Sequence, residues 1–270
     1  YSTLAVIICY IDRVNISVAI IPMQEQFGWS DSQVGFIFSS FYLGYMLTMA
    51  LGGYLADRFG GKFVLGCGVV LWSLFTILTP LAAHNGFFVL LIMRVLLGLG
   101  EGVTFPAWHS LYARWIPFKE RTRAIAFTNS GIAIGTIIGY IGTQLFIISL
   151  GWEWAFYLFG VIGIIWFFFW NKNVTSYPRD HKKISSEELS YIENNAPASE
   201  AITQIPLSKL LSNLPFIAII VATFANNWSL LVFLSFLPKF VDNELGVDLS
   251  SGSFLVLIII PSIVSVIALN

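Results

Sequence analysis

The feature that most constrains this chain is a series of apolar runs, each about 20 residues long, set between shorter polar stretches. The runs predict helices at 3–21, 34–56, 63–82, 87–112, 124–148, 154–170 and 215–238, and an eighth that begins near residue 253. A helix of about 20 residues can cross the hydrocarbon core of a bilayer. Membrane barrels show instead alternating segments of about ten residues. We therefore predict an all-α integral membrane protein.

Composition supports this class and narrows the possible functions. Hydrophobic residues make up 57% of the 270 residues and charged residues 11%, whereas soluble domains carry about 25% charged residues. The net charge of −1 gives no indication of nucleic-acid binding. The sequence shows no metal-ligand cluster, nucleophile–base pair or phosphate loop, so we expect no cofactor, no metal and no enzymatic activity. Cys9 and Cys67 both lie in apolar runs, and we expect no disulfide between them.

A polar stretch divides the chain. It includes "NKNVTSYPRDHKKISSEELSYIENN", in which a short amphipathic helix is expected at 186–194, with Ser185 or Ser186 as its N-cap. We expect an N-terminal six-helix transmembrane bundle at 1–170, a cytoplasmic linker at 171–212 and the first two helices of a C-terminal bundle at 213–270. That second bundle is incomplete, and the chain starts inside an apolar run without Met. We therefore expect a fragment of a longer protein or a truncated product.

Basic residues predict the orientation. Eleven of the 14 Lys and Arg residues fall in alternate loops, which the positive-inside rule assigns to the cytoplasm. The other set of loops holds Lys239 alone. The eleven are Arg58, Lys62, Arg114, Lys119, Arg121, Arg123, Lys172, Arg179, Lys182, Lys183 and Lys209. The helix count and the charge count thus agree on six spans followed by a cytoplasmic linker.

Four charged residues fall inside predicted spans: Asp12, Arg13, Arg94 and Glu101. Each would cost about 2.5–3.5 kcal/mol at the centre of a lipid-facing helix, so four unpaired charges would cost on the order of 10 kcal/mol. We expect them to face the bundle interior or a water-filled cavity. Such residues mark substrate and ion pathways, which indicates a transporter.

Helical spacing suggests roles for these side chains. Arg94 and Glu101 are seven residues apart, about two turns, and share a face, so a purely structural pair is one alternative. Arg13 beside a cavity is suited to hold a carboxylate or phosphate, because its guanidinium presents a planar fork of donors. His109 lies about 80° from Glu101 around the helix and near the membrane edge, where a packing role is the alternative.

Glycines repeat at four-residue spacing in two predicted helices, at Gly98 and Gly102 and at Gly131, Gly135 and Gly139. Small residues at this spacing let helix backbones approach closely in a membrane. We interpret these glycines as packing positions rather than as binding positions.

The loop between the second and third predicted helices reads "GGYLADRFGGKFVL" and lies on the cytoplasmic side. It resembles the signature G-x-L-a-D-r-x-G-r-k of the major facilitator superfamily, and the matching residues are Gly53, Leu55, Asp57, Arg58, Gly60 and Lys62. Gly61 departs from it, since Arg or Lys is usual there. The resemblance implies that Asp57 helps to stabilise one conformation. It also implies a fold of twelve helices in two halves, each built from inverted repeats.

Further segments narrow the resemblance. "YIDRVNISVAI", "RVLLGLGEGVTFPAWHSLYARWIP", "KERTRA" and "FANNWSLLVFLSFLP" together resemble the anion:cation symporter family, which includes sialin, the vesicular glutamate transporters, sodium–phosphate cotransporters and sugar-acid–proton symporters. This resemblance implies that substrate is bound by Arg13, Tyr45, Asn226 and Asn227. It implies that proton coupling involves Asp12, Glu101, Arg94 and His109, with Glu101 as the acid that is protonated during transport. Asn226 stands where the glutamate transporters carry Arg, which argues against a vesicular glutamate role.

The prediction is a secondary active transporter that moves an organic anion or phosphate, coupled to H⁺ or Na⁺, by alternating access. Two alternatives stay open: an uncoupled uniporter or channel-like anion pathway, and a truncated remnant that does not transport. A seven-helix receptor is disfavoured, because it explains neither the loop motif nor Glu101. The expected partners are the anion, the coupling ion and the bilayer of a plasma or organelle membrane, with no nucleic acid. We expect a monomer.

Overall fold

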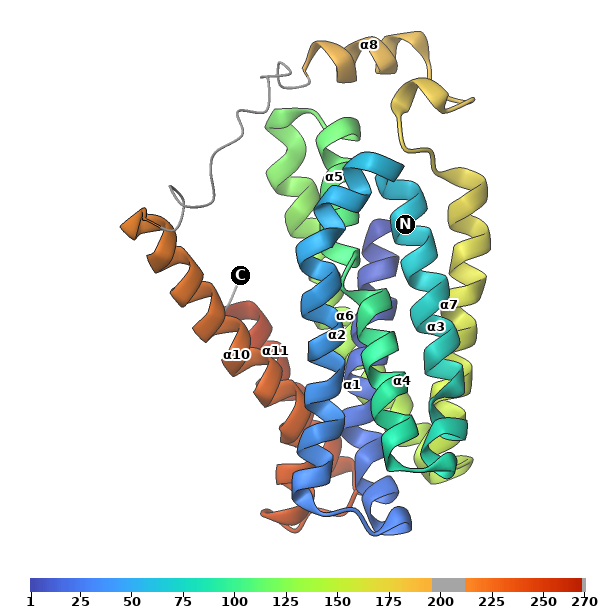
Figure 1. The fold of residues 1–270 in the computed structure, drawn as a ribbon, viewed down its shortest axis with the longest axis vertical. Coiled ribbons are helices and arrows are strands. Elements are labelled where there is room, and N and C mark those ends of the chain that lie inside the picture. Colours follow the sequence, from blue (N-terminus) through green and yellow to red (C-terminus); the bar gives the residue numbers. More distant parts are fainter. Residues whose placement is uncertain (196–211, 269–270) are drawn as a thin grey trace.

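A computed structural model of the chain describes residues 1–195 and 212–268, and its ordered elements are helices (Figure 1). They are α1 (Ser2–Phe27), α2 (Asp31–Phe59), α3 (Gly61–Asn85), α4 (Phe87–Glu101), α5 (Thr104–Trp115), α6 (Phe118–Ser149), α7 (Trp152–Asn173), the 3₁₀ turn η1 (Pro178–Asp180), α8 (Ser186–Asn194), α10 (Leu214–Asn243) and α11 (Gly252–Ala268). A helix is present at each of the eight predicted positions, and the prediction of an all-α multi-pass membrane protein is confirmed. Among the described residues, six helices are long and apolar enough to cross a membrane, or seven if the bent α2 counts as one span.

The helices extend beyond their predicted bounds because caps, rather than apolar residues, set their ends. Helix α2 begins at Asp31 because the Ser30 hydroxyl accepts a hydrogen bond from the backbone N–H of Gln33 at 3.3 Å, while the Gln33 side chain accepts one from the Ser30 N–H at 2.9 Å. Helix α1 ends where Gly28 adopts a left-handed conformation with φ 65°. The predicted fourth helix is in fact two, α4 and α5, which meet at residues 102–103.

Helix α1 lies inside the first six spans. Most of its residues from Ala5 to Ile20 are buried, and it packs along α6, while α2 packs along α4 and α3 contacts both α4 and α7 (Figure 1). The predicted glycine faces form these contacts. A Cβ atom on Gly98 would lie 2.1 Å from the carbonyl oxygen of Phe41, and one on Gly135 would lie 2.5 Å from that of Ile7. Close packing at these glycines, as predicted, therefore brings α2 against α4 and α1 against α6.

The described part of the linker docks on one end of the bundle. Helix α8 has the predicted bounds, and Ser185 is its N-cap, with its hydroxyl accepting from the Glu188 N–H at 3.1 Å. The Tyr191 hydroxyl donates to Glu120 at 2.7 Å, and the Trp115 indole donates to the Thr175 carbonyl at 3.0 Å. The remainder of the predicted linker, including Lys209, lies outside the described residues.

Helix α10 contacts the bundle along its last third. Its buried residues are Leu234, Ser235, Pro238, Lys239 and Val241, whereas residues 214–229 are exposed apart from a half-buried Phe216. In Figure 1 α10 meets the bundle at the end remote from α8 and leans away towards the α8 end. We call the end of the bundle that carries α8 the linker end, and the opposite end, where α10 makes its contacts, the outer end.

Candidate functional site

The centre of the bundle holds a buried ion pair between two helices. Arg13 Nη2 on α1 lies 2.9 Å from Glu101 Oε2 on α4, with Arg13 7% and Glu101 0% exposed. Arg13 sits near the middle of α1, well inside the span. Charges at this depth are costly unless they are paired, and here the pairing joins elements 88 residues apart in sequence.

The pairing of Arg94 with Glu101, raised above as an alternative, is not formed among the described residues. Two turns of one helix separate the two residues by about 10 Å along its axis. Helix α1 instead presents Arg13 directly to Glu101. Helical periodicity predicted correctly that Arg94 is buried, at 2% exposure, but could not show that a different helix supplies the partner of Glu101.

Asp12 and Arg94 complete the charged cluster without an ion pair among the described residues. Asp12 is 2% exposed and lies close to the Trp72 indole and within electrostatic range of Glu101 and Arg94. Both carboxyl oxygens of Asp12, Nε and Nη1 of Arg94 and Oε1 of Glu101 lack a partner within hydrogen-bond geometry among the described residues. These donors and acceptors are available to a ligand, water or proton.

Aromatic rings surround the two guanidinium groups. Arg13 Cζ lies 4.7 Å from the ring centroid of Tyr10 and 4.8 Å from that of Tyr45, and Arg94 Cζ lies 5.0 Å from that of Phe41. Cation–π contacts of this kind hold a guanidinium without occupying its N–H donors. The predicted site residue Tyr45, on α2, therefore does contact Arg13. The sequence did not lead us to predict Tyr10 or Phe41 as members of the site. Tyr10 precedes Arg13 by three residues, and that spacing was a signal for it.

Cys9 is a further member that the sequence analysis did not place in the site. Its thiol donates to Glu101 Oε2 at 3.3 Å, and its sulfur lies 3.6 Å from Arg13 Nη2. One carboxylate oxygen of Glu101 therefore receives both the guanidinium and the thiol. Cys9 lies four residues before Arg13, on the same helical face, which was the available signal.

Three predicted site residues lie apart from this cluster. His109 is exposed on α5, with its ring stacked on Trp108 at 3.7 Å. Asn226 and Asn227 are exposed on the part of α10 that leans away from the bundle. Ser235 contacts the bundle, and Asn226 lies two and a half turns before it, on the opposite face of α10. Asn227 lies about 80° from Ser235 around the helix axis.

The loop motif joins neighbouring helices at the linker end of the bundle. Asp57 accepts a hydrogen bond from Ser110 at 3.1 Å and lies 4.0 Å from Arg114, both on α5. Lys62 donates to the Asn171 carbonyl on α7 at 2.9 Å. Arg58 donates to the hydroxyl of Tyr54 at 3.0 Å, one turn away on α2. Asp57 thus lies at the linker end and outside the central charged cluster.

Gly60 and Gly53, the motif's glycines, differ in their surroundings. Gly60 has φ 87°, and a Cβ atom there would lie 2.6 Å from the Ser176 hydroxyl, so a side chain is excluded for two reasons. Gly53 has no atom within 4 Å of the position a Cβ would take. The turn geometry therefore explains Gly60 but not Gly53.

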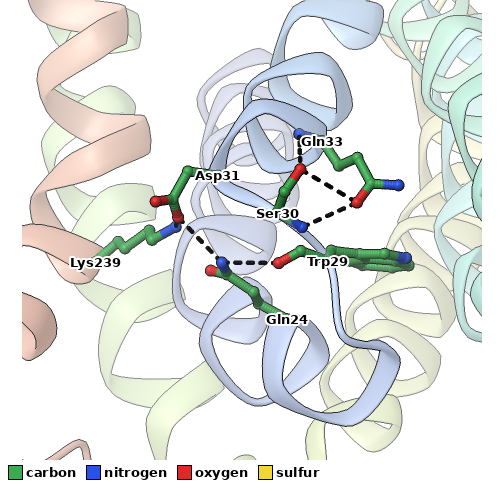
Figure 2. A network of polar contacts seen from close by, with 6 residues as sticks. All are labelled: Gln24, Trp29, Ser30, Asp31, Gln33 and Lys239. Carbon is green, nitrogen blue, oxygen red and sulfur yellow. Dashed lines mark hydrogen bonds and ion pairs between the residues drawn. The ribbon is translucent and has the colours of Figure 1, made fainter.

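At the outer end, an ion pair links α10 to the first six spans (Figure 2). Lys239 Nζ lies 2.5 Å from Asp31 Oδ1, which also accepts a hydrogen bond from Gln24 at 3.0 Å. Gln24 bonds in addition to the carbonyl of Trp29 at 3.0 Å, which fixes the turn between α1 and α2. Lys239 was predicted to be the one basic residue of the outer loops, and the structure adds its acidic partner, 208 residues away.

Two buried contacts lie deeper along the same face of α10. The Tyr140 hydroxyl on α6 donates to the Leu234 carbonyl at 2.9 Å, and the Tyr42 hydroxyl on α2 lies 3.4 Å from the Ser235 hydroxyl. Together with the Lys239 ion pair they hold α10 against α2 and α6.

Known proteins resemble this chain along most of its length. A family model described as Major Facilitator Superfamily matches residues 2–269. The chloroplast ascorbate transporter of Arabidopsis thaliana is 42% identical over 249 residues, which cover 92% of this chain and 46% of that protein. The chloroplast sodium-dependent phosphate transport protein 1 of Arabidopsis thaliana is 39% identical over 251 residues, 93% of this chain and 49% of that protein. The chain therefore spans about half the length of these curated relatives.

Among solved structures, a bacterial homologue of the human lysosomal transporter Spinster, in an inward-facing and unoccupied conformation, matches with a TM-score of 0.68. The match covers 97% of this chain and 58% of that one at 23% sequence identity. At this identity the likeness concerns the fold alone.

Proposed function

The chain belongs to the major facilitator superfamily, as its loop motif predicted, and we propose that it is part of a secondary active transporter for an organic anion or phosphate. Residues 1–170 form the N-terminal bundle of this transporter, residues 171–212 its cytoplasmic linker and residues 213–270 the first two helices of its second bundle. The relatives' names, an ascorbate transporter and a sodium-dependent phosphate transport protein, support an anion as the substrate.

The buried Arg13–Glu101 pair carries the proposal. A guanidinium is a strong bidentate partner for carboxylate and phosphate groups, and this one lies at mid-membrane depth beside the Tyr45 ring. Arg13 Nη2 is taken by Glu101 in this structure. An incoming anion that binds both Nη groups of Arg13 would compete with Glu101 for it, whereas Nε of Arg13 has no hydrogen-bond partner among the described residues.

That competition couples binding of the anion to binding of a proton. While Arg13 is paired with Glu101, the positive guanidinium compensates the negative charge of the Glu101 carboxylate. Once a substrate anion takes Arg13, the carboxylate is left buried beside a second negative charge, and both effects favour its neutral, protonated form. Substrate binding and proton binding thus assist each other. Asp12, buried and without a hydrogen-bond partner among the described residues, is a second group that can take up a proton here.

Alternating access requires that the outer and cytoplasmic sides open in turn. The contacts of α10 through Leu234, Ser235 and Lys239 hold the end of α10 against the first bundle at the outer end. These contacts are those that a state closed on the outer side requires. Asp57, bonded to α5 within the first bundle, stabilises one state of the cycle rather than touching substrate.

The test is transport by a full-length protein that includes this chain, reconstituted in proteoliposomes, with either a pH gradient or a Na⁺ gradient imposed. Glu101→Gln mimics the protonated side chain permanently. It should bind substrate with little pH dependence and exchange substrate for substrate, but it should not accumulate substrate in response to a pH gradient. Accumulation by this variant would show that Glu101 is not the coupling residue. Uptake by the unmodified protein that responds to neither gradient would favour the uncoupled uniporter instead.

A further inference from the structure

Cys9 is a buried thiol that the transport scheme leaves without a role. It is 0% exposed on α1, and its sulfur donates to Glu101 Oε2 at 3.3 Å and accepts from Arg13 Nη2 at 3.6 Å. The same Nη2 and Oε2 atoms are 2.9 Å apart. The three groups therefore form a closed triangle of hydrogen bonds. A buried cysteine usually packs as a small apolar side chain, but this one directs its polar atom at a carboxylate.

The thiol differs from the guanidinium in the hydrogen bonds that it can offer Glu101. A guanidinium only donates, whereas a thiol can donate to a carboxylate and can also accept from the O–H of a protonated carboxyl group. The contact between Cys9 and Glu101 is therefore compatible with both protonation states of Glu101. The ion pair with Arg13 exists only while Glu101 is ionised.

The two groups are also anchored differently. Cys9 and Arg13 lie about one turn apart on α1, but the sulfur is bonded directly to Cβ, whereas the guanidinium ends a long side chain with several rotatable bonds. Arg13 can therefore turn towards an anion without any movement of Cys9. Arg13 Nε and Glu101 Oε1 have no hydrogen-bond partner among the described residues, so both groups have a free position for an exchange of partners. The thiol stays as a donor to Glu101 after the guanidinium has left.

Other charged and titratable groups face Glu101 from α1, α2 and α4. Asp12 and Arg94 lie within electrostatic range of it, with charges of opposite sign, and so do the hydroxyl groups of Tyr42 and Tyr45. Among the described residues, Glu101 is bonded by Cys9 and Arg13 and by none of these four. A substitution at Cys9 leaves all four in place, so a comparison of Cys9 variants isolates the effect of the thiol.

We propose that Cys9 is a positioning residue for Glu101, whose thiol stays bonded to the carboxyl group when Arg13 turns to a bound anion and thereby sets the pH at which Glu101 takes up a proton. This role rests on the proposed transport function and adds a residue to its coupling site. A hydrogen bond donated to a carboxylate favours the ionised form. Because a thiol is a weak and neutral donor, it offsets only part of the lost ion pair, so a bound anion still favours proton uptake.

The experiment follows Glu101 by infrared spectroscopy in the purified full-length protein that includes this chain, in nanodiscs and without substrate. The band of the protonated carboxyl group is assigned by its loss in Glu101→Gln, and the midpoint is the pH at which half of the band has appeared. Cys9→Ala should raise the midpoint by about 0.3–1 on the pH scale, or about two- to tenfold in proton affinity, the value of one hydrogen bond. Cys9→Ser keeps a donor and should return the midpoint to the unmodified value or below it. Cys67→Ala removes the partly exposed cysteine of α3, is the matched control and should leave the midpoint unchanged.

The S–H stretching band of Cys9 gives a second measurement that needs no Cys9→Ala protein. The band is assigned by its loss in Cys9→Ser. It should shift with the same midpoint as the Glu101 band, because the group bonded to the thiol changes from a carboxylate to a neutral carboxyl group. In Glu101→Gln the S–H band should not change with pH.

Each outcome decides the role of Cys9. Equal midpoints in the unmodified protein and Cys9→Ala, or equal shifts in Cys9→Ala and Cys9→Ser, would overturn it, as would an S–H band that does not respond to protonation of Glu101. No titration of Glu101 in the unmodified protein would overturn both this role and the proposed coupling. A shifted midpoint in a protein whose uptake in proteoliposomes responds to no gradient would support the role of the thiol and count against the proposed function, which separates the two failures.

Discussion

The hydrogen bond between Tyr140 and Leu234 gives the sharpest prediction about the outer closure. Within a helix, the Leu234 carbonyl would accept from the N–H four residues on, but that residue is Pro238, which has no N–H. The Tyr140 hydroxyl on α6 supplies the missing donor at 2.9 Å, in a place where Tyr140 is 0% and Leu234 2% exposed. Tyr140→Phe removes this donor and keeps the aromatic ring.

The size of the expected free-energy change depends on the hydrogen-bond partners that the Leu234 carbonyl has in the outer-closed and outer-open states. With the outer end closed, the variant leaves a buried acceptor without this partner, whereas opening the outer end exposes the carbonyl to water. A net loss of about 0.5–1.5 kcal/mol is expected. The ratio of outer-closed to outer-open protein should therefore fall by about two- to tenfold. Pro238→Ala restores a backbone donor, and in that background Tyr140→Phe should shift the ratio by less than about twofold.

The assay is double electron–electron resonance between spin labels at Ser32 on α2 and Glu244 after α10, both exposed at the outer end. The ratio of the short-distance to the long-distance population is compared between variants of the full-length protein in nanodiscs. Tyr112→Phe is the control, because the Tyr112 hydroxyl pairs with Thr128 within the first bundle. An unchanged ratio in Tyr140→Phe, or an equal shift with Ala at position 238, would refute this account of the closure.

Other predictions test the remaining parts of the site. Arg13→Lys should weaken substrate binding by at least tenfold, because a point charge replaces a planar fork of donors; equilibrium binding measures it, and unchanged affinity would contradict the role. Asp57→Asn should slow turnover while leaving equilibrium binding within about twofold, since Asp57 contacts α5 and not the central cluster; a loss of binding as large as in Arg13→Lys would count against it. Lys239→Gln should shift the outer-closed population in the same direction as Tyr140→Phe, by about two- to fivefold, with less effect at high salt because Asp31 is exposed. Gly98→Val should prevent correct assembly, because its Cβ would lie 2.1 Å from a backbone oxygen; a monodisperse peak of unmodified thermal stability in detergent would be the contrary result.

Much of the fold could be predicted from sequence because it depends on local signals. Apolar run length predicted the spans, and the orientation inferred from charge stays a prediction. The glycine spacing indicated the close faces at Gly98 and Gly135, which the structure confirms. Helix ends were less predictable, because an N-cap such as Ser30 adds a turn of helix that an apolar window does not register.

The four buried charges were predictable one by one, but their pairing was not, and neither were the neighbours Cys9, Tyr10 and Phe41. Burial of Asp12, Arg13, Arg94 and Glu101 follows from their cost in lipid, whatever their partners. Which of them meet depends on how α1 and α4 pack, and periodicity along α4 alone pointed to the wrong arginine. The Lys239–Asp31 pair spans 208 residues and two different helices, and no local pattern contains that information.

The structure also bears on whether such a transporter is coupled or leaks. An anion that takes Arg13 while Glu101 is ionised leaves a buried carboxylate without its partner, which costs about 3–5 kcal/mol. Under the proposed coupling, the loaded carrier then gains about 3–5 kcal/mol by taking up a proton at Glu101, which favours movement of the anion together with a proton. Arg94 lies within electrostatic range of Glu101 without touching it, and its charge lowers this gain. A smaller gain leaves a larger share of the loaded carriers unprotonated. Strict coupling therefore depends on Arg94 staying stacked on Phe41 and out of contact with Glu101, so a variant that lets Arg94 reach Glu101 should transport but accumulate poorly.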